Sequence, residues 1–269
     1  MIRNPVVAGQ FYSGSKESLA KEAKELVNET AQKQDAIGVV SPHAGYMYSG
    51  PVAGCTLSSI NPKSKYIIMG PNHTGLGSPF SMSASDIWKT PLGEVAVDKD
   101  LAGKILENCP EIKKDELSHI HEHSIEVQLP FLQVLQKEFT FVPIVVAGSS
   151  PENYTKIGEG IAKSIKALKI EKDTVIIASS DMTHYESQDT AKDKDSHAID
   201  AILKLDEKAL MESIAKFDIT MCGYAPVAIM LAAAKKLGAK RGHLIKYQTS
   251  GDASGDYSSV VGYAGIIIS

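Results

Sequence analysis

The chain has 269 residues, of which 43% are hydrophobic, and a formal net charge of -4 at pH 7. This length can bury a sizeable core, and the absence of a basic excess argues against nucleic acid or an anionic membrane as the main partner. No stretch is apolar for the length of a membrane span, and the N-terminal segment is too interrupted to be a signal peptide. The three cysteines are widely spaced and form no CxxC pair, so we expect a cytoplasmic protein without a disulfide framework or a zinc ribbon.

Apolar periodicity divides the chain into alternating helices and strands. In chain order it predicts a helix over 15–33, a strand over 37–41, a helix that begins near Pro51, a strand over 66–69, strands joined by a turn within 80–97 and a helix over 99–107. It continues with a helix over 125–138, a strand over 141–147, a helix over 152–168, a strand over 174–179, helices over 190–204, 206–216 and 226–237, and a strand over 260–268.

Individual residues refine these elements. Ser15 is expected to cap the first helix, and Pro130 should kink the helix over 125–138 or delay its start. The polar segment 249–259 is predicted to be either a mobile loop near the site or a surface connection. The alternation of strands and helices predicts one α/β domain over residues 1–269, with a central, mostly parallel or mixed sheet flanked by helices.

Three histidines each follow an apolar run that is typical of a buried strand: His43, His73 and His184. The carboxyl ends of parallel strands share one edge of a sheet, where ligands bind. Imidazole is a common metal ligand and proton carrier, so the pattern predicts a shared metal or acid–base site. Taken singly, each could instead be a loop histidine that bonds to the backbone.

Other residues could belong to the same site. Asp181 precedes His184 by three residues and could orient its ring, share the site or cap the next helix. In the histidine-rich segment 118–124 only His123 is assigned to the site, because it is nearest the predicted helix start. His119 and His121 are interpreted as bystanders.

Cys222 precedes the helix predicted to open at Pro226. A helix dipole lowers the pKa of a thiol near its N-terminus, which suits a metal ligand or a nucleophile. The alternative is a small buried hydrophobic residue. No GxGxxG, P-loop or GxSxG motif supports a dinucleotide, nucleotide or serine-hydrolase function.

Taken together, these segments resemble the Memo family, whose bacterial and archaeal members are often called AmmeMemoRadiSam system protein B. The resemblance covers essentially the whole chain. It includes the His43 and His73 motifs and the segments RNPVVAGQFY (3–12), EHSIE (122–126), SDMTHY (180–185), MCGY (221–224) and VGYAG (261–265).

The resemblance implies a fold similar to that of class III (LigB-type) extradiol dioxygenases, which are non-haem iron enzymes. By that likeness His43 and His73 would be metal ligands, His184 the acid–base residue and His123 a second polar group lining the pocket. Cys222 stands where the dioxygenases have a glutamate. Two imidazoles and a thiolate form a softer donor set, so the ring-cleavage activity does not carry over directly.

Two main functions follow as hypotheses. The first is a metal-dependent redox protein in which His43, His73 and Cys222 hold a metal ion and Asp181 supports them. Iron or copper is expected more than zinc. The second is a non-catalytic binding or adaptor protein that takes a peptide or small ligand, as animal Memo proteins associated with signalling do. A metal-assisted hydrolase or metal carrier ranks below both. The family name also implies radical-SAM and AMMECR-type partner proteins.

Overall fold

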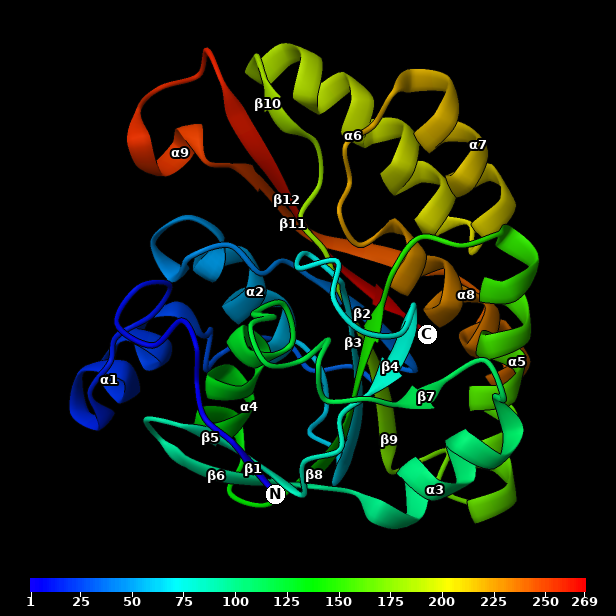
Figure 1. Cartoon of the computed structure of the whole chain (residues 1–269). Helices are drawn as coiled ribbons and strands as arrows, with labels where there is room; N and C mark the ends of the chain where they lie inside the picture. The colour runs from blue at the N-terminus through cyan, green and yellow to red at the C-terminus, as the bar shows by residue number, and fades with distance from the viewer.

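The computed structural model describes all residues from 1 to 269, and its framework is one twelve-stranded mixed sheet (Figure 1). The strands are β1 (Ile2–Arg3), β2 (Gly38–Ser41), β3 (Lys65–Pro71), β4 (Phe80–Met82), β5 (Ile87–Thr90), β6 (Gly93–Val97), β7 (Lys113–Lys114), β8 (Thr140–Val146), β9 (Thr174–Ser179), β10 (His184–Glu186), β11 (Gly242–Thr249) and β12 (Val260–Ile268). Their order along the sheet is β1-β5-β6-β8-β3-β9-β2-β12-β10, with β11 on β12 and with β4 joining β7 to β8.

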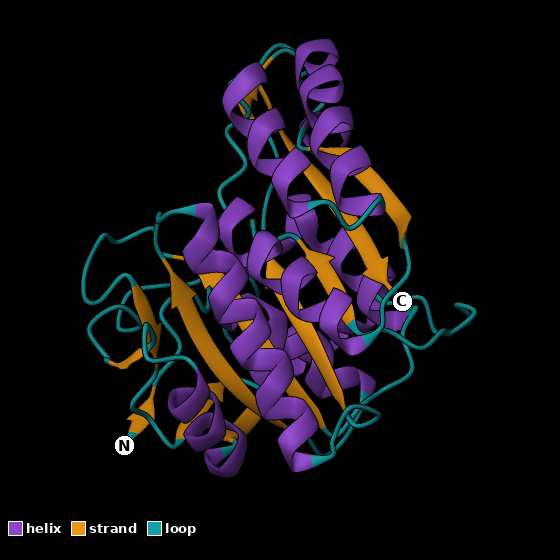
Figure 2. Ribbon diagram, turned by 90° about the vertical axis from the view of Figure 1, so that its right-hand side faces the viewer, coloured by secondary structure: helices purple, strands orange, loops and turns teal.

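Helices cover both faces of the sheet (Figure 2). They are α1 (Lys16–Leu26), α2 (Tyr46–Ser58), α3 (Lys99–Asn108), α4 (Leu129–Leu135), α5 (Pro151–Leu168), α6 (Gln188–Leu203), α7 (Glu207–Phe217), α8 (Tyr224–Leu237) and the short α9 (Gly251–Ser254). Helices α1, α2 and α4 pack on one face, and α3, α5, α6, α7 and α8 pack on the other. No helix is both long enough and apolar enough to cross a membrane.

The central strands are parallel and buried on both faces. β6, β8, β3, β9 and β2 run parallel, whereas β12 runs antiparallel to β2. In β3, Ile67 and Met69 belong to one core and Tyr66 and Ile68 to the other, as expected from side chains that alternate across a strand. This explains why the strands read as continuous apolar runs, and it confirms the predicted single-domain α/β fold.

The boundaries of the first two helices differ from the prediction. α1 begins after Ser15, which caps it as predicted, but it ends at Leu26 rather than at residue 33. The Asn28 side chain accepts a hydrogen bond from the Thr30 backbone, and that local turn competes with the helix. α2 begins at Tyr46, not near Pro51. Pro51 is tolerated because the carbonyl it leaves unpaired belongs to exposed Met47, near the start of the helix.

The later elements of the chain follow the prediction in part. Pro130 delays the helix as predicted: the 3-10 turn Glu126–Gln128 precedes α4. β10 and β11 were not predicted, and both exist through antiparallel pairing with β12. The segment 249–259, predicted to be a loop, contains the short helix α9. α8 begins two residues before Pro226.

Candidate metal site

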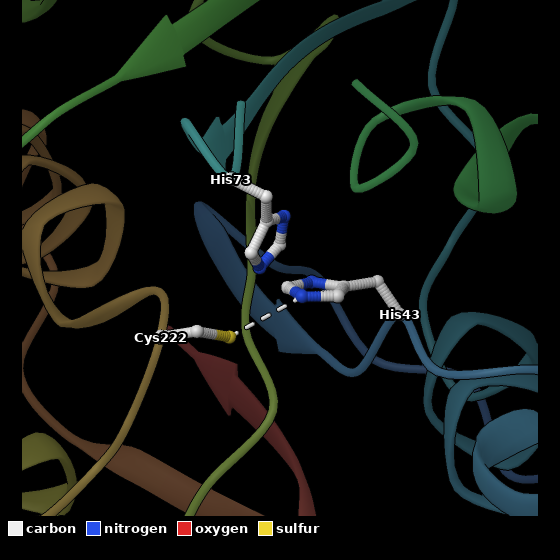
Figure 3. A group of neighbouring side chains, drawn as sticks. All are labelled: His43, His73 and Cys222. Carbon is white, nitrogen blue, oxygen red and sulfur yellow. Dashed lines mark hydrogen bonds between the residues drawn. The ribbon is translucent and has the colours of Figure 1, made fainter. Parts of the chain in front are cut away.

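Three adjacent parallel strands carry the predicted residues to one edge of the sheet. β3, β9 and β2 are neighbours, and His73, Asp181 and His43 follow them directly. Cys222 comes from the connection between α7 and α8. In Figure 3 its sulfur and the two imidazole rings point toward a common centre. The ligand atoms of His43, His73 and Cys222 all lie within 4.8 Å of one another.

The tautomer of His43 is fixed by its neighbours. The Ser179 hydroxyl donates to the carbonyl of Ser124 at 2.6 Å, so it must accept from His43 Nδ1, 3.0 Å away. The unprotonated Nε2 then faces Cys222 Sγ at 3.2 Å. Burial lowers the pKa of His43 well below its usual value, and the neighbouring rings of His73 and His123 lower it further. The ring is therefore neutral near pH 7, with a lone pair directed at the site.

A buried carboxylate orients His73. Its Nδ1 lies 3.0 Å from Glu122 Oε1, and its backbone N–H donates to Glu122 Oε2 at 2.7 Å. Burial alone would lower the pKa of His73, but the hydrogen bond and charge of Glu122 outweigh it and raise that pKa. Burial opposes ionisation of Glu122, yet its hydrogen bonds, first that from His73, bring its pKa down to about 2. His73 thus holds its proton on Nδ1 and keeps Nε2 for a ligand.

Glu122 could also count as a ligand, because Glu122, His73 and His123 form a second compact group of donors. Its oxygens, however, already accept hydrogen bonds from the backbone of His73, His123 and Ser124 as well as from the His73 ring. A carboxylate so fully engaged suits an orienting role better than direct ligation.

The pKa of the Cys222 thiol differs from the prediction, which expected the helix dipole to lower it. Burial, reinforced by the charge of Asp181, raises the pKa of the Cys222 thiol, although α8 begins only two residues later. The helix dipole is therefore the weaker effect here, because the sulfur is removed from solvent. The Asp181 backbone N–H donates to Sγ at 3.3 Å. A cation beside the sulfur would reverse the balance and favour the thiolate.

This donor set fits a metal ion. Both histidines have one nitrogen fixed by a hydrogen-bond partner and the other free, which is the arrangement usual for imidazole ligands. Ligands about 2.0–2.3 Å from one ion lie roughly 3–4 Å apart. Here Cys222 Sγ lies 3.2 Å from His43 Nε2, and all three ligand atoms lie within 4.8 Å of one another.

His123 and Asp181 adjoin the cluster. The His123 ring stacks on His73 with centroids 4.8 Å apart, and Phe11 packs against it edge-on at 4.7 Å. The Ser124 hydroxyl donates to the carbonyl of Pro71. Asp181 accepts from the His43 backbone N–H at 2.8 Å. Burial raises the pKa of Asp181, because a carboxylate is costly away from water.

His184 lies apart from the compact cluster. Its Nδ1 donates to the Thr220 carbonyl at 3.0 Å, and its backbone N–H donates to the Thr220 hydroxyl at 2.7 Å. Asp181 therefore does not orient its ring by a hydrogen bond, as the sequence had suggested it could. His184 remains half-buried, with Nε2 free.

The sequence did not identify the supporting residues as such. Arg3 is buried and pairs with Glu126 at 2.8 Å while it donates to the carbonyls of His119 and Glu122. Glu126 also accepts from the hydroxyl of Tyr12. This network holds the segment that carries Glu122 and His123, and it accounts for the N-terminal motif. Charged residues within apolar segments could have indicated this network from the sequence, because charged side chains are seldom buried without a partner.

The fold and site together define an α/β protein with a candidate two-histidine, one-cysteine centre at the carboxyl edge of its sheet. A family model described as Memo-like protein matches residues 3–267. The chain is 45% identical over 269 residues to a MEMO1 family protein of Methanosarcina mazei, with 99% of each chain covered. It is 45% identical over 284 residues to one of Sulfolobus acidocaldarius, and 43% identical over 281 residues to one of Methanopyrus kandleri, again with 99% of each chain covered. The chain belongs to the Memo family.

Proposed function

We propose that this protein is a metal-dependent redox protein in which His43, His73 and Cys222 hold iron or copper. One observation carries the proposal: two imidazoles with fixed tautomers and a sulfur converge at one strand edge. The resemblance in fold to iron-dependent dioxygenases favours a redox metal over zinc, and the donor set suits either iron or copper.

Such an ion would supply electron transfer and a coordination position for a small-molecule substrate. The chain's own residues would transfer protons and position the ligands. His123 is a neutral proton acceptor near pH 7, because burial lowers its pKa. His184 has a free Nε2 at the half-buried rim and is suited to carry protons between substrate and solvent. Asp181 holds the His43 backbone in place.

The test is the metal content of protein purified without added metal. We expect iron or copper in an equimolar amount in the wild type, and its loss in the double variant His43→Ala/His73→Ala. His121→Ala is the matched control, because His121 is an exposed histidine of the same loop as His123. Equal metal content in the double variant and the wild type would rule out the proposed ligands.

A second function, a binding or adaptor protein, has one observation in its favour. Of the ten exposed large hydrophobic side chains, six lie within five residues of His43, His73, Glu122 or His184. They are Met47, Tyr48, Leu76, Leu117, Ile120 and Tyr185. Exposed apolar side chains in the segments that carry the site would suit binding of a peptide. Oxygen uptake with a small phenol that disappears in His184→Ala would exclude pure binding, whereas ligand capture without turnover would support it.

A further inference from the structure

A pocket lies beside Tyr185, the residue that directly follows His184. It has a volume of about 370 Å³ and lies between the start of α2, β10 and the β11–α9–β12 segment. In Figure 1, α9 and β10 lie on either side of β12. The lining residues are Tyr48, Tyr185, Ser250, Ser254, Asp256, Ser259, Val261 and Tyr263. This volume lies within the range of small-ligand pockets.

One residue that lines the pocket is in contact with His184, the proposed acid–base residue. Tyr185 directly follows His184, and their rings meet edge-on with centroids 5.8 Å apart. Tyr263, from β12, lines the same pocket. A ligand that contacts the Tyr185 ring would therefore lie close to His184.

Tyr185 is held in an unfavourable backbone conformation. Its φ is +61°, in the left-handed region that bulky side chains rarely adopt. It is the extra residue of an irregularity in the β10–β12 pairing, where His184 is opposite Val261 and Glu186 is opposite Val260. Its side chain is 79% exposed, so burial does not compensate for the strain. Bulges and strained residues concentrate at functional sites, where they redirect a side chain.

The lining favours a positive charge. It contains three tyrosine rings and one carboxylate, but no lysine or arginine. Asp256 Oδ1 accepts hydrogen bonds from the backbone and hydroxyl of Ser258, which lower the pKa of Asp256 and keep it ionised. Its Oδ2 makes no hydrogen bond within the chain. Aromatic faces and a free carboxylate oxygen are what recognise ammonium groups.

We propose that this pocket binds the cationic end of a small organic ligand, an ammonium or methylated ammonium group, with Tyr185 as the specificity-determining residue. That the other end of this ligand reacts at the metal rests on the proposed function. Binding of the cationic end does not.

The probes are benzyltrimethylammonium, neutral benzyl alcohol and anionic benzoate, titrated by NMR into the full chain before and after chelation. We expect the cation to bind about fivefold or more tightly than either other probe. Tyr185→Leu and Asp256→Asn should each weaken it severalfold. Tyr257→Leu should not, because Tyr257 is an exposed tyrosine of the same segment that does not line the pocket.

A further variant separates recognition from structure. Tyr185→Gly should weaken cation binding and raise Tm, because glycine adopts a positive φ without strain. Equal binding of the three probes, or unchanged cation binding in Tyr185→Leu, would overturn the proposal. If the purified protein holds no metal and still prefers the cation, only the proposed function is refuted. If the protein holds metal but shows no preference for the cation, only the proposal for this pocket is refuted.

Discussion

At the scale of single residues, Glu122 decides how His73 is presented. Its carboxylate is buried, accepts a hydrogen bond from the ring and accepts three more from the backbone of residues 73, 123 and 124. An imidazole that bonds to an ionised carboxylate is oriented and made more basic. Glu122 therefore acts through His73 as a positioning residue, without itself being a ligand.

We expect Glu122→Gln to lower metal affinity by about 10–100-fold, because a neutral amide orients the ring less well. The measurement is competition with a chelator at alkaline pH, where protons no longer compete for His73. NMR titration should also show that the pKa of His73 falls, because the carboxylate charge that raises it is gone. Glu116→Gln is the control, since Glu116 binds the backbone of residues 84 and 85 instead. Unchanged affinity in Glu122→Gln would reject the positioning role.

At the scale of elements, the loop before α4 is held by contacts distant in sequence. Arg3 lies over the ring of Trp88, at 3.9 Å from its centroid, and pairs with Glu126 in the interior. Glu126 also accepts from the backbone of Val6 and Val7. The N-terminal segment is therefore a support of the site and not a peripheral tail.

Arg3→Ala should lower the free energy of unfolding by about 3–5 kcal/mol, because it leaves the buried Glu126 carboxylate without its charged partner. Urea denaturation measures this change. Arg241→Ala, at an exposed arginine, should change stability by less than about 0.5 kcal/mol. Similar losses in the two variants would mean that the Arg3–Glu126 pair contributes no more than a surface side chain.

At the scale of the whole molecule, the metal site couples several elements. His43 and His73 follow β2 and β3, whereas Cys222 belongs to the segment that leads into α8. An ion held between them would bind the folded chain much more tightly than the unfolded chain, so metal binding and folding should be linked.

Metal at about 100 times its Kd should raise Tm by roughly 5–10 °C, because it adds about 2.7 kcal/mol of stability. At a fixed metal concentration the shift should grow with pH, since the thiol of Cys222, whose pKa burial raises, must lose its proton on binding. Thermal unfolding with and without chelator measures both effects. Cys222→Ser should reduce the shift. A Tm indifferent to chelator at every pH would contradict this linkage.

Much of the fold could be predicted from the sequence because its signals are local. Apolar runs identified β2, β3, β8, β9 and β12, and turn residues placed His43 and His73 directly after two of them. The sequence also drew attention to Cys222, although the expected effect of the helix dipole on its pKa was outweighed by burial. β10 is only three residues long and depends on β12, so no local pattern could reveal it.

The sequence by itself determined the α/β class and which residues stand at strand ends, because periodicity and turn chemistry depend on near neighbours. Only the tertiary structure decided which of them meet. His73 and Glu122 are 49 positions apart, and His43 and Cys222 are 179 apart. Such contacts depend on strand order and on the packing of helices against the sheet, which juxtapose segments that the chain keeps far apart.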